Sequence, residues 1–113
     1  MSHFKNKLEE LKYNSKKYLR IARKRAKEYD LNPKLLEFSD NPDSKLMYDK
    51  TAYFGAPDYN DYIIYSLLEE DGKITQEYKN ERRNAYLKRA TKIKGNWKNN
   101  KLSANNLAIN ILW

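Results

Sequence analysis

The sequence of 113 residues contains no cysteine, one histidine, three glycines and three prolines. Without cysteine the chain can form no disulfide and no thiolate zinc site, and it has no thiol nucleophile. A single histidine, His3, argues against a histidine-rich metal site and against a serine–histidine–aspartate arrangement. We therefore expect a protein that is not an enzyme and that binds no metal or cofactor.

Long hydrophobic runs are also missing. No stretch of about 18 residues is free of charge, and lysine and glutamate interrupt the N-terminal part too often for a secretory signal. We expect a soluble protein that is not secreted, does not enter a membrane and stays inside a cell or a particle. The low glycine and proline content and the absence of low-complexity segments predict a single small folded domain over residues 1–113.

Positive charge is abundant, with 23 lysines and arginines against 15 acidic residues and a formal net charge of +8. Residues 1–29 carry 10 basic and 3 acidic side chains, residues 30–73 carry 4 and 10, and residues 74–113 carry 9 and 2. Either the central acids pair with a basic arm inside the fold, or the arms present positive surface to an anionic partner. The sequence alone leaves both alternatives open.

The apolar pattern of the first basic arm predicts one long helix over residues 1–29. Apolar residues recur there at steps of three, four and seven, which is helical spacing. The helix should end before Pro33, because Asn32 precedes a proline and is disfavoured in the α conformation. A short second helix is expected over residues 33–38.

The acidic middle segment has extended character. Residues 45–48 and 51–54 flank Asp49 and Lys50, which can form a two-residue hairpin loop. Residues 62–67 are a third β-prone stretch. Together the three segments predict a small antiparallel sheet, since two strands alone are marginal in water.

The second basic arm predicts a helix that starts after the cap residue Thr75 and stops at Gly95. A short helix capped by Ser103 follows. The predicted fold class is therefore α+β, with a basic helical arm over residues 1–31 and an α+β core over 32–113. The inward side of the second basic helix is expected to carry Tyr78, Arg82 or Ala85, Tyr86, Ala90 and Ile93.

Two clusters of cations carry the main functional signal. The first places seven cations within twelve residues with no acid among them, and the second lies on the later helix. Such clusters predict binding to phosphates with a steep salt dependence, or to an acidic protein surface, whereas the alternative is a solvated face balanced by the acidic segment. The candidate binding residues are Lys16, Lys17, Arg20, Arg23, Lys24, Arg25 and Lys27, with Arg82, Arg83, Lys88 and Arg89.

The ten tyrosines are interleaved with these cations and could stack on unpaired bases. Tyr18, Tyr78 and Tyr86 fall on the predicted inward faces, which favours a role in the core of a small domain instead. The apolar C-terminal segment has two interpretations as well, because it either completes the core or docks onto another protein. The candidate docking residues are Leu107, Ile111, Leu112 and Trp113.

Acidic residues offer a minor alternative, a metal-dependent nuclease with arginines downstream. Its carboxylates would come from Asp58 and Asp61 and from the run at residues 69–71. A competing structural role is an internal ion pair of Arg82 or Arg83 with one of these aspartates. We expect most of these acids to pair with the basic arms.

The order of several short motifs in the sequence resembles a small uncharacterised family of large DNA viruses of eukaryotes and some tailed phages. SDNP stands at 39–42, YFGA at 53–56, an Asp-Tyr pair at 61–62, ERR with a tyrosine and an arginine at 81–89, and SANNLAINILW at 103–113. The family pattern has histidine where this chain has Tyr53, and residues 67–74 are an insertion relative to it. The resemblance covers about residues 39–113 and implies a viral protein, without an established activity.

The sequence thus predicts a non-enzymatic viral structural protein, either a minor capsid protein or an internal component of the virion. Its location would be the virion or the interior of the host cell, in the cytoplasm or nucleus. Its partners would be nucleic acid, through phosphates without base readout, capsid proteins, or both, and it could form an oligomer. The main alternative is a sequence-independent DNA- or RNA-binding protein.

Overall fold

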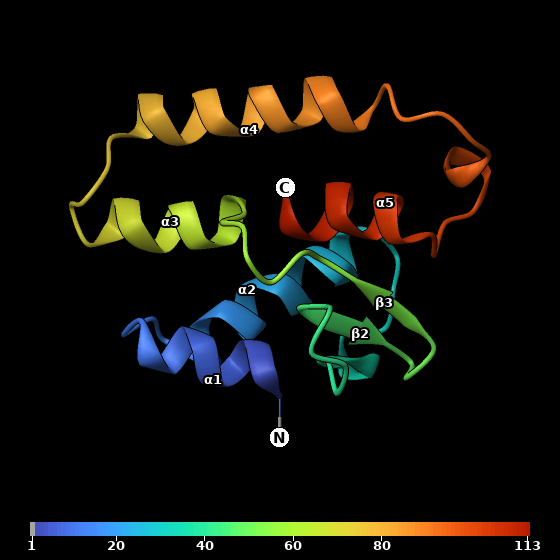
Figure 1. Cartoon of the computed structure of the whole chain (residues 1–113), viewed down its shortest axis with the longest axis horizontal. Helices are drawn as coiled ribbons and strands as arrows, with labels where there is room; N and C mark the ends of the chain where they lie inside the picture. The colour runs from blue at the N-terminus through green and yellow to red at the C-terminus, as the bar shows by residue number, and fades with distance from the viewer. Residues whose placement is uncertain (1) are drawn as a thin grey trace.

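Figure 1 shows the computed structural model of the protein, which describes residues 2–113. Within this range the chain forms five α-helices and a three-stranded antiparallel sheet, so the predicted α+β fold class is confirmed. Helices α3 (Tyr62–Glu70) and α4 (Gln76–Ala90) lie side by side on one side of the molecule, and α1 (His3–Glu10) and the sheet lie on the other (Figure 1).

The first basic arm is not the single helix that its apolar spacing predicts. It consists of α1 and α2 (Ser15–Glu28), separated by a tight turn. Lys12 adopts a left-handed conformation with φ of 67°, and the next N–H, of Tyr13, donates back to the Leu8 carbonyl, which terminates α1. Asn14 then caps α2 by accepting from the Lys17 N–H. These local caps outweigh the continuous apolar pattern.

The turn lets α1 fold back onto α2 and close one side of the core. The rings of Phe4 on α1 and Tyr18 on α2 meet edge to face with centroids 5.3 Å apart. Leu8 is buried in the same cluster. The N-terminal arm is therefore packed into the domain along one side of each helix.

The hairpin is confirmed by β2 (Leu46–Tyr48) and β3 (Ala52–Phe54), which pair antiparallel. Asp49 and Lys50 in the connection have left-handed φ of 53° and 56°, and the Thr51 N–H donates to the Tyr48 carbonyl. Because Tyr48 pairs with Ala52, the connection has three residues instead of the predicted two.

The other two predictions in the middle segment are wrong. Residues 33–38 form a short 3-10 turn, η1 (Pro33–Leu35), followed by the edge strand β1 (Leu36–Phe38), and it is this strand that pairs with β2. Residues 62–67 belong instead to α3, because Asp61 caps its first turn and Ile63, Ile64 and Leu67 form a buried helical stripe.

Helix α4 begins at the predicted cap, Thr75, whose hydroxyl accepts from the Tyr78 N–H, but it ends before the predicted stop at Gly95. The helix lies over α3 and the C-terminal helix as an outer layer (Figure 1). Of its predicted inward residues Ala90 is buried and Tyr86 is partly buried, whereas Tyr78 and Ile93 are exposed.

The C-terminal segment completes the core of the chain. A 3-10 turn, η2 (Trp97–Asn99), leads to α5 (Ala104–Leu107), capped by Ser103 as predicted, and α5 continues as a wider π-helical turn, η3 (Ala108–Leu112). It packs against α2 and β3. The four candidate docking residues are buried here, which corrects the docking interpretation in favour of the core: Leu107, Ile111, Leu112 and Trp113.

No helix within residues 2–113 has the length and apolar character needed to cross a membrane.

Candidate functional site

The outer side of α2 carries an array of cations. Tyr18, Ala22 and Ala26 bury the inner side of the helix. The exposed cations recur at helical spacing on the opposite side, over about 16 Å at 1.5 Å per residue. We call this array the α2 cationic face, and it consists of Lys16, Arg20, Lys24 and Lys27.

The acidic middle segment does not neutralise this face. Within residues 2–113, the carboxylates of the middle segment that form ion pairs bind lysines elsewhere, and Lys17 alone of the eleven candidate cations reaches a carboxylate, that of Glu70. Both aspartates proposed as partners of Arg82 or Arg83 pair with lysines. The other ion pairs are Lys7 with Asp58, Lys45 with Asp61 and Lys79 with Glu69.

Three of the candidate arginines are partly buried and belong to the fold. Arg23 donates from Nε to the Leu36 carbonyl at 3.0 Å, which ties α2 to β1. Arg25 and Arg83 lie over the same Tyr62 ring, at 5.9 Å and 5.3 Å from its centroid. Burial, with the neighbouring Arg83 charge, lowers the pKa of Arg25. These three side chains are held by contacts within the fold and are less accessible to a partner than the exposed cations.

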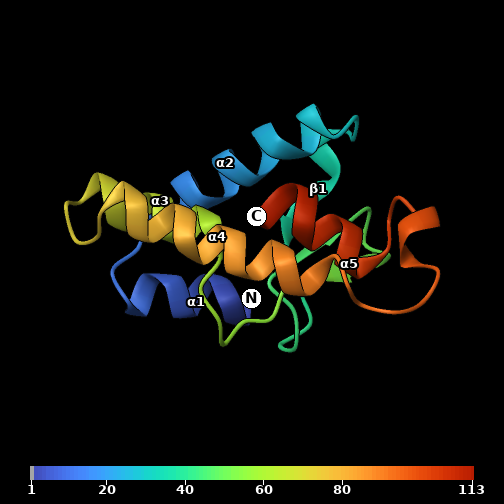
Figure 2. The same cartoon turned by 90° about the horizontal axis from the view of Figure 1, so that it is seen from above.

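The second predicted cluster faces another part of the molecule. Figures 1 and 2 show the C-terminal helix lying between α2 and α4. On α4, Arg82, Lys88 and Arg89 are exposed. The exposed residues of the two clusters therefore lie on different parts of the surface, whereas the partly buried Arg25 and Arg83 approach each other at Tyr62.

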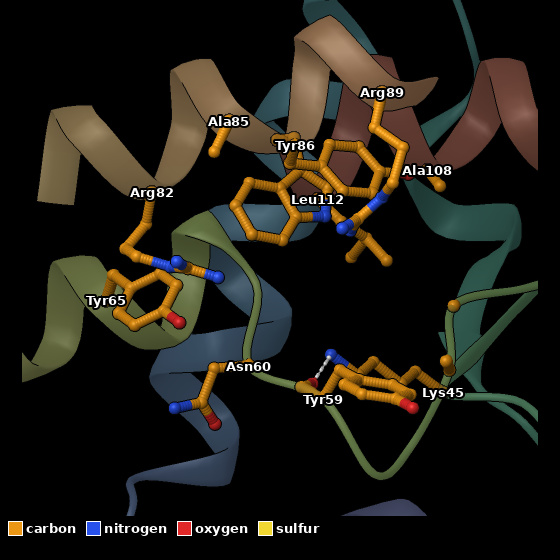
Figure 3. Close-up of a pocket in the computed structure, with 13 residues that line it drawn as sticks. Lys45, Tyr59, Asn60, Tyr65, Arg82, Ala85, Tyr86, Arg89, Ala108 and Leu112 are labelled. Carbon is orange, nitrogen blue, oxygen red and sulfur yellow. Dashed lines mark hydrogen bonds between the residues drawn. The ribbon is translucent and has the colours of Figure 1, made fainter. Parts of the chain in front are cut away.

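Arg82 and Arg89 descend from α4 over a cavity of about 390 Å³ (Figure 3). The cavity lies between α4, the C-terminal helix and the segment after β3. One wall is the stacked pair of Tyr86 and Trp113, with ring centroids 4.2 Å apart and an angle of 10° between the planes. The remaining lining residues are Lys45, Gly55, Ala56, Tyr59, Asn60, Tyr65, Ala85, Ala108 and Leu112.

Several short motifs of the viral resemblance meet at this cavity, although they are far apart in the chain. They contribute Gly55 and Ala56, Arg82, Tyr86 and Arg89, and the final Leu112 and Trp113. Sequence reasoning did not identify Tyr59, Asn60 or Tyr65 as site residues. A periodic pattern could not reveal them, because two of them lie in an irregular loop.

A buried polar triad, Tyr18, Lys45 and Asp61, holds that loop against the rest of the fold. Asp61 accepts from the Tyr18 hydroxyl at 2.5 Å and from Lys45 Nζ at 2.9 Å, and its second oxygen caps α3. Lys45 Nζ also donates to the Tyr59 carbonyl at 2.6 Å. Burial, together with the Asp61 charge, raises the pKa of Tyr18 well above its usual value, so this phenol stays protonated as the donor.

Gly55, which lines the cavity, permits close packing of the main chain against Leu112 and Lys45. Its φ is +88°, and a Cβ placed on it would lie 2.9 Å from Leu112 Cδ1 and 3.0 Å from Lys45 Cβ. The residue therefore needs both a left-handed backbone and the absence of a side chain.

Replacing Gly55 by alanine should lower the free energy of unfolding by about 1–3 kcal/mol through crowding alone, in addition to the cost of the left-handed backbone. Gly72→Ala is the matched control, because Gly72 also has a positive φ, of 72°, but a Cβ there meets no atom within 4 Å. Urea denaturation of both variants isolates the effect of crowding. Equal losses would show that the backbone conformation alone accounts for the destabilisation.

The carboxylates considered for a nuclease do not converge. Asp58 is on the surface with Lys7, Asp61 is enclosed in the triad, and Glu69 and Glu70 bind lysines on α4 and α2. Among residues 2–113 no group of three acidic or histidine side chains is placed to hold a metal ion. The geometry does not support this alternative.

Comparison with known proteins adds no assignment, since the chain matches no protein-family model, no curated protein and no solved structure. The viral resemblance therefore stays a prediction, and the two cationic surfaces are the features of the structure that bear on function.

Proposed function

We propose that this protein is a non-enzymatic structural component of a viral particle that binds the phosphate backbone of nucleic acid through the α2 cationic face. The observation that carries the proposal is an array of four exposed cations on one side of α2, none of which reaches a carboxylate within residues 2–113. The viral setting is supported by the sequence resemblance alone.

The spacing of the α2 cationic face favours a linear anionic partner. Lys16, Arg20 and Lys24 stand four residues apart, at which like charges repel and destabilise an isolated helix. A row of phosphates would relieve this repulsion along the whole face and release counterions on binding. Such contacts position a protein on nucleic acid without reading its bases.

Replacing the four cations of the α2 cationic face by glutamine tests the proposal. We expect the wild-type protein to bind a DNA duplex with an affinity that falls steeply with salt. In the fourfold variant the slope of log affinity against log salt should decrease by about 0.9 for each phosphate that is no longer neutralised. Fluorescence anisotropy of a labelled duplex at several salt concentrations measures both the affinity and its slope.

A control variant with the same net charge separates this face from general electrostatic attraction. Lys5, Lys34, Lys73 and Lys94 are exposed on other parts of the molecule, and their replacement by glutamine should change the slope far less. Equal losses in the two variants would show general electrostatic attraction and contradict a role for this face. A flat salt dependence in the wild-type protein would contradict phosphate binding and favour an acidic protein surface as the partner.

The viral setting needs a separate test. We expect the protein to remain with purified particles of the virus that encodes it after loosely bound material has been washed away. Its presence in infected cells but not in particles would instead favour the alternative, a sequence-independent nucleic-acid-binding protein.

A further inference from the structure

We propose that the cavity under Arg82 and Arg89 accepts one unpaired nucleotide of a single strand. The base would enter between the aromatic side chains, and the two arginines would bind the phosphates on either side of it. This inference rests on the proposed nucleic-acid function and adds a second site, a preference for unpaired nucleotides and the residues that contact them.

The charge of the cavity fits two anionic groups. Arg82 and Arg89 are exposed, and neither reaches a carboxylate within residues 2–113. None of the side chains lining the cavity is acidic. The two arginines stand seven residues apart on one side of α4, about 10 Å along the helix, and Figure 3 shows them above different parts of the cavity. Guanidinium groups bind phosphates through paired hydrogen bonds.

The aromatic side chains fit a base. Tyr59 is 74% exposed and lies across the cavity from Tyr86 (Figure 3). Within residues 2–113 its ring packs against no other aromatic ring, whereas Tyr86 is already stacked on Trp113. A base stacked against such rings gains affinity without sequence preference. Burying Tyr59 would also remove an exposed aromatic surface from water.

The size and rigidity of the cavity favour a single nucleotide over a duplex. Its volume of about 390 Å³ is at the small end of ligand sites. The main chain at Tyr59 is held by Lys45 Nζ, and Asp61 fixes the end of the same loop at α3. The site is therefore formed before binding, which lowers the cost of ordering it. An acidic peptide side chain would supply one anion where the arginines offer two binding positions.

Trp113 can report occupancy once the other tryptophan is removed. In a Trp97→Phe protein, we expect thymidine 3′,5′-bisphosphate to quench Trp113 fluorescence saturably, because this probe carries one base flanked by two phosphates. A short single-stranded oligothymidylate should give the same quenching at lower concentration. Thymidine 5′-monophosphate should bind more weakly than the bisphosphate.

In the Trp97→Phe protein, the Arg82→Gln replacement and the Arg89→Gln replacement should each weaken binding of the bisphosphate by about tenfold. This is the usual effect of losing a hydrogen bond to a charged group. Lys92→Gln with Lys94→Gln is the control, since both lysines are exposed near the end of α4 and do not line the cavity. The absence of quenching, quenching unaffected by both arginine replacements, or quenching by an acidic peptide but by neither nucleotide probe would overturn the inference.

The two proposals fail in different ways. The Arg82→Gln, Arg89→Gln double variant should retain salt-dependent duplex binding through the α2 cationic face. The fourfold α2 variant should lose duplex binding but still be quenched by the bisphosphate. Loss of the quenching result with normal duplex binding would contradict the cavity alone, whereas absence of duplex binding with normal quenching would contradict the α2 proposal.

Discussion

Replacing Asp61 by alanine is expected to lower the free energy of unfolding by about 3–5 kcal/mol. The carboxylate is 1% exposed and is the partner of a lysine ammonium that is 2% exposed. Its loss would leave the buried Lys45 ammonium without a counter-charge, with the Tyr59 carbonyl and the Phe4 ring as neighbours. It would also deprive the Tyr18 hydroxyl of its acceptor and remove the cap of α3. Because small domains have a total stability of about 5–15 kcal/mol, urea denaturation followed by circular dichroism should show a large shift of the midpoint.

Asp58→Ala is the matched control. Asp58 also pairs with a lysine, Lys7, but its side chain is 85% exposed. Water solvates both charges when the pair is broken, so the urea midpoint should hardly move. Similar shifts for the two aspartates would contradict the view that burial makes the Lys45–Asp61 pair critical.

A double replacement distinguishes an unpaired buried charge from general damage to the core. Lys45→Met combined with Asp61→Leu removes both charges and keeps apolar volume, so it should be more stable than Asp61→Ala alone. Some loss should remain, because the Tyr18 hydroxyl and the first turn of α3 still lack an acceptor. A double variant as unstable as the single one would show that these two hydrogen bonds dominate.

Local signals predicted the parts of the fold that depend on a few neighbouring residues. Thr75 and Ser103 cap helices as expected, and Asp49 and Lys50 form the hairpin turn. The broken first helix carried a local signal too, since Asn14 is a good cap residue, but the apolar spacing ran across it. The cap at Asn14 decided the structure, because a new helix begins there although the apolar pattern continues.

The segment at residues 62–67 shows why a β-prone composition can mislead. Its isoleucines and tyrosines favour strands in general, yet Asp61 supplies a helix cap and the apolar residues Ile63, Ile64 and Leu67 lie on one helical side. Conversely, β1 forms because β2 offers it an edge to pair with. The partner strand lies later in the chain, so the sequence of residues 33–38 alone could not predict the pairing.

One part of the candidate site, the cations of α2, could be predicted from the sequence, and the other part, the cavity, could not. The cations of α2 were found from the sequence because charge density is local, although which of them stay exposed depends on the packing of Arg23 and Arg25 against β1 and Tyr62. The cavity could not be predicted, because it exists only where α4, η3 and the loop containing Tyr59 meet.

Replacing Leu107 by alanine is expected to destabilise the protein by about 2–5 kcal/mol, because its side chain is fully buried and a cavity would remain. Leu107 is the last residue of α5, which packs against β3, and the following turn, η3, packs against α2. The replacement therefore removes apolar packing where the C-terminal segment contacts both the sheet and α2. The shift in thermal or urea unfolding measures this destabilisation.

Leu102→Ala is the control within the same segment, since Leu102 is 38% exposed and should cost well under about 1 kcal/mol. If the C-terminal leucines served mainly to dock onto another protein, Leu107→Ala would leave the isolated chain as stable as Leu102→Ala and would weaken that association instead. A large loss for Leu107 alone, with no change in oligomeric state, requires its partners to be within the same chain. The buried face of η3 then supports the wall of the cavity, and the fully buried Leu107 is not available to a partner.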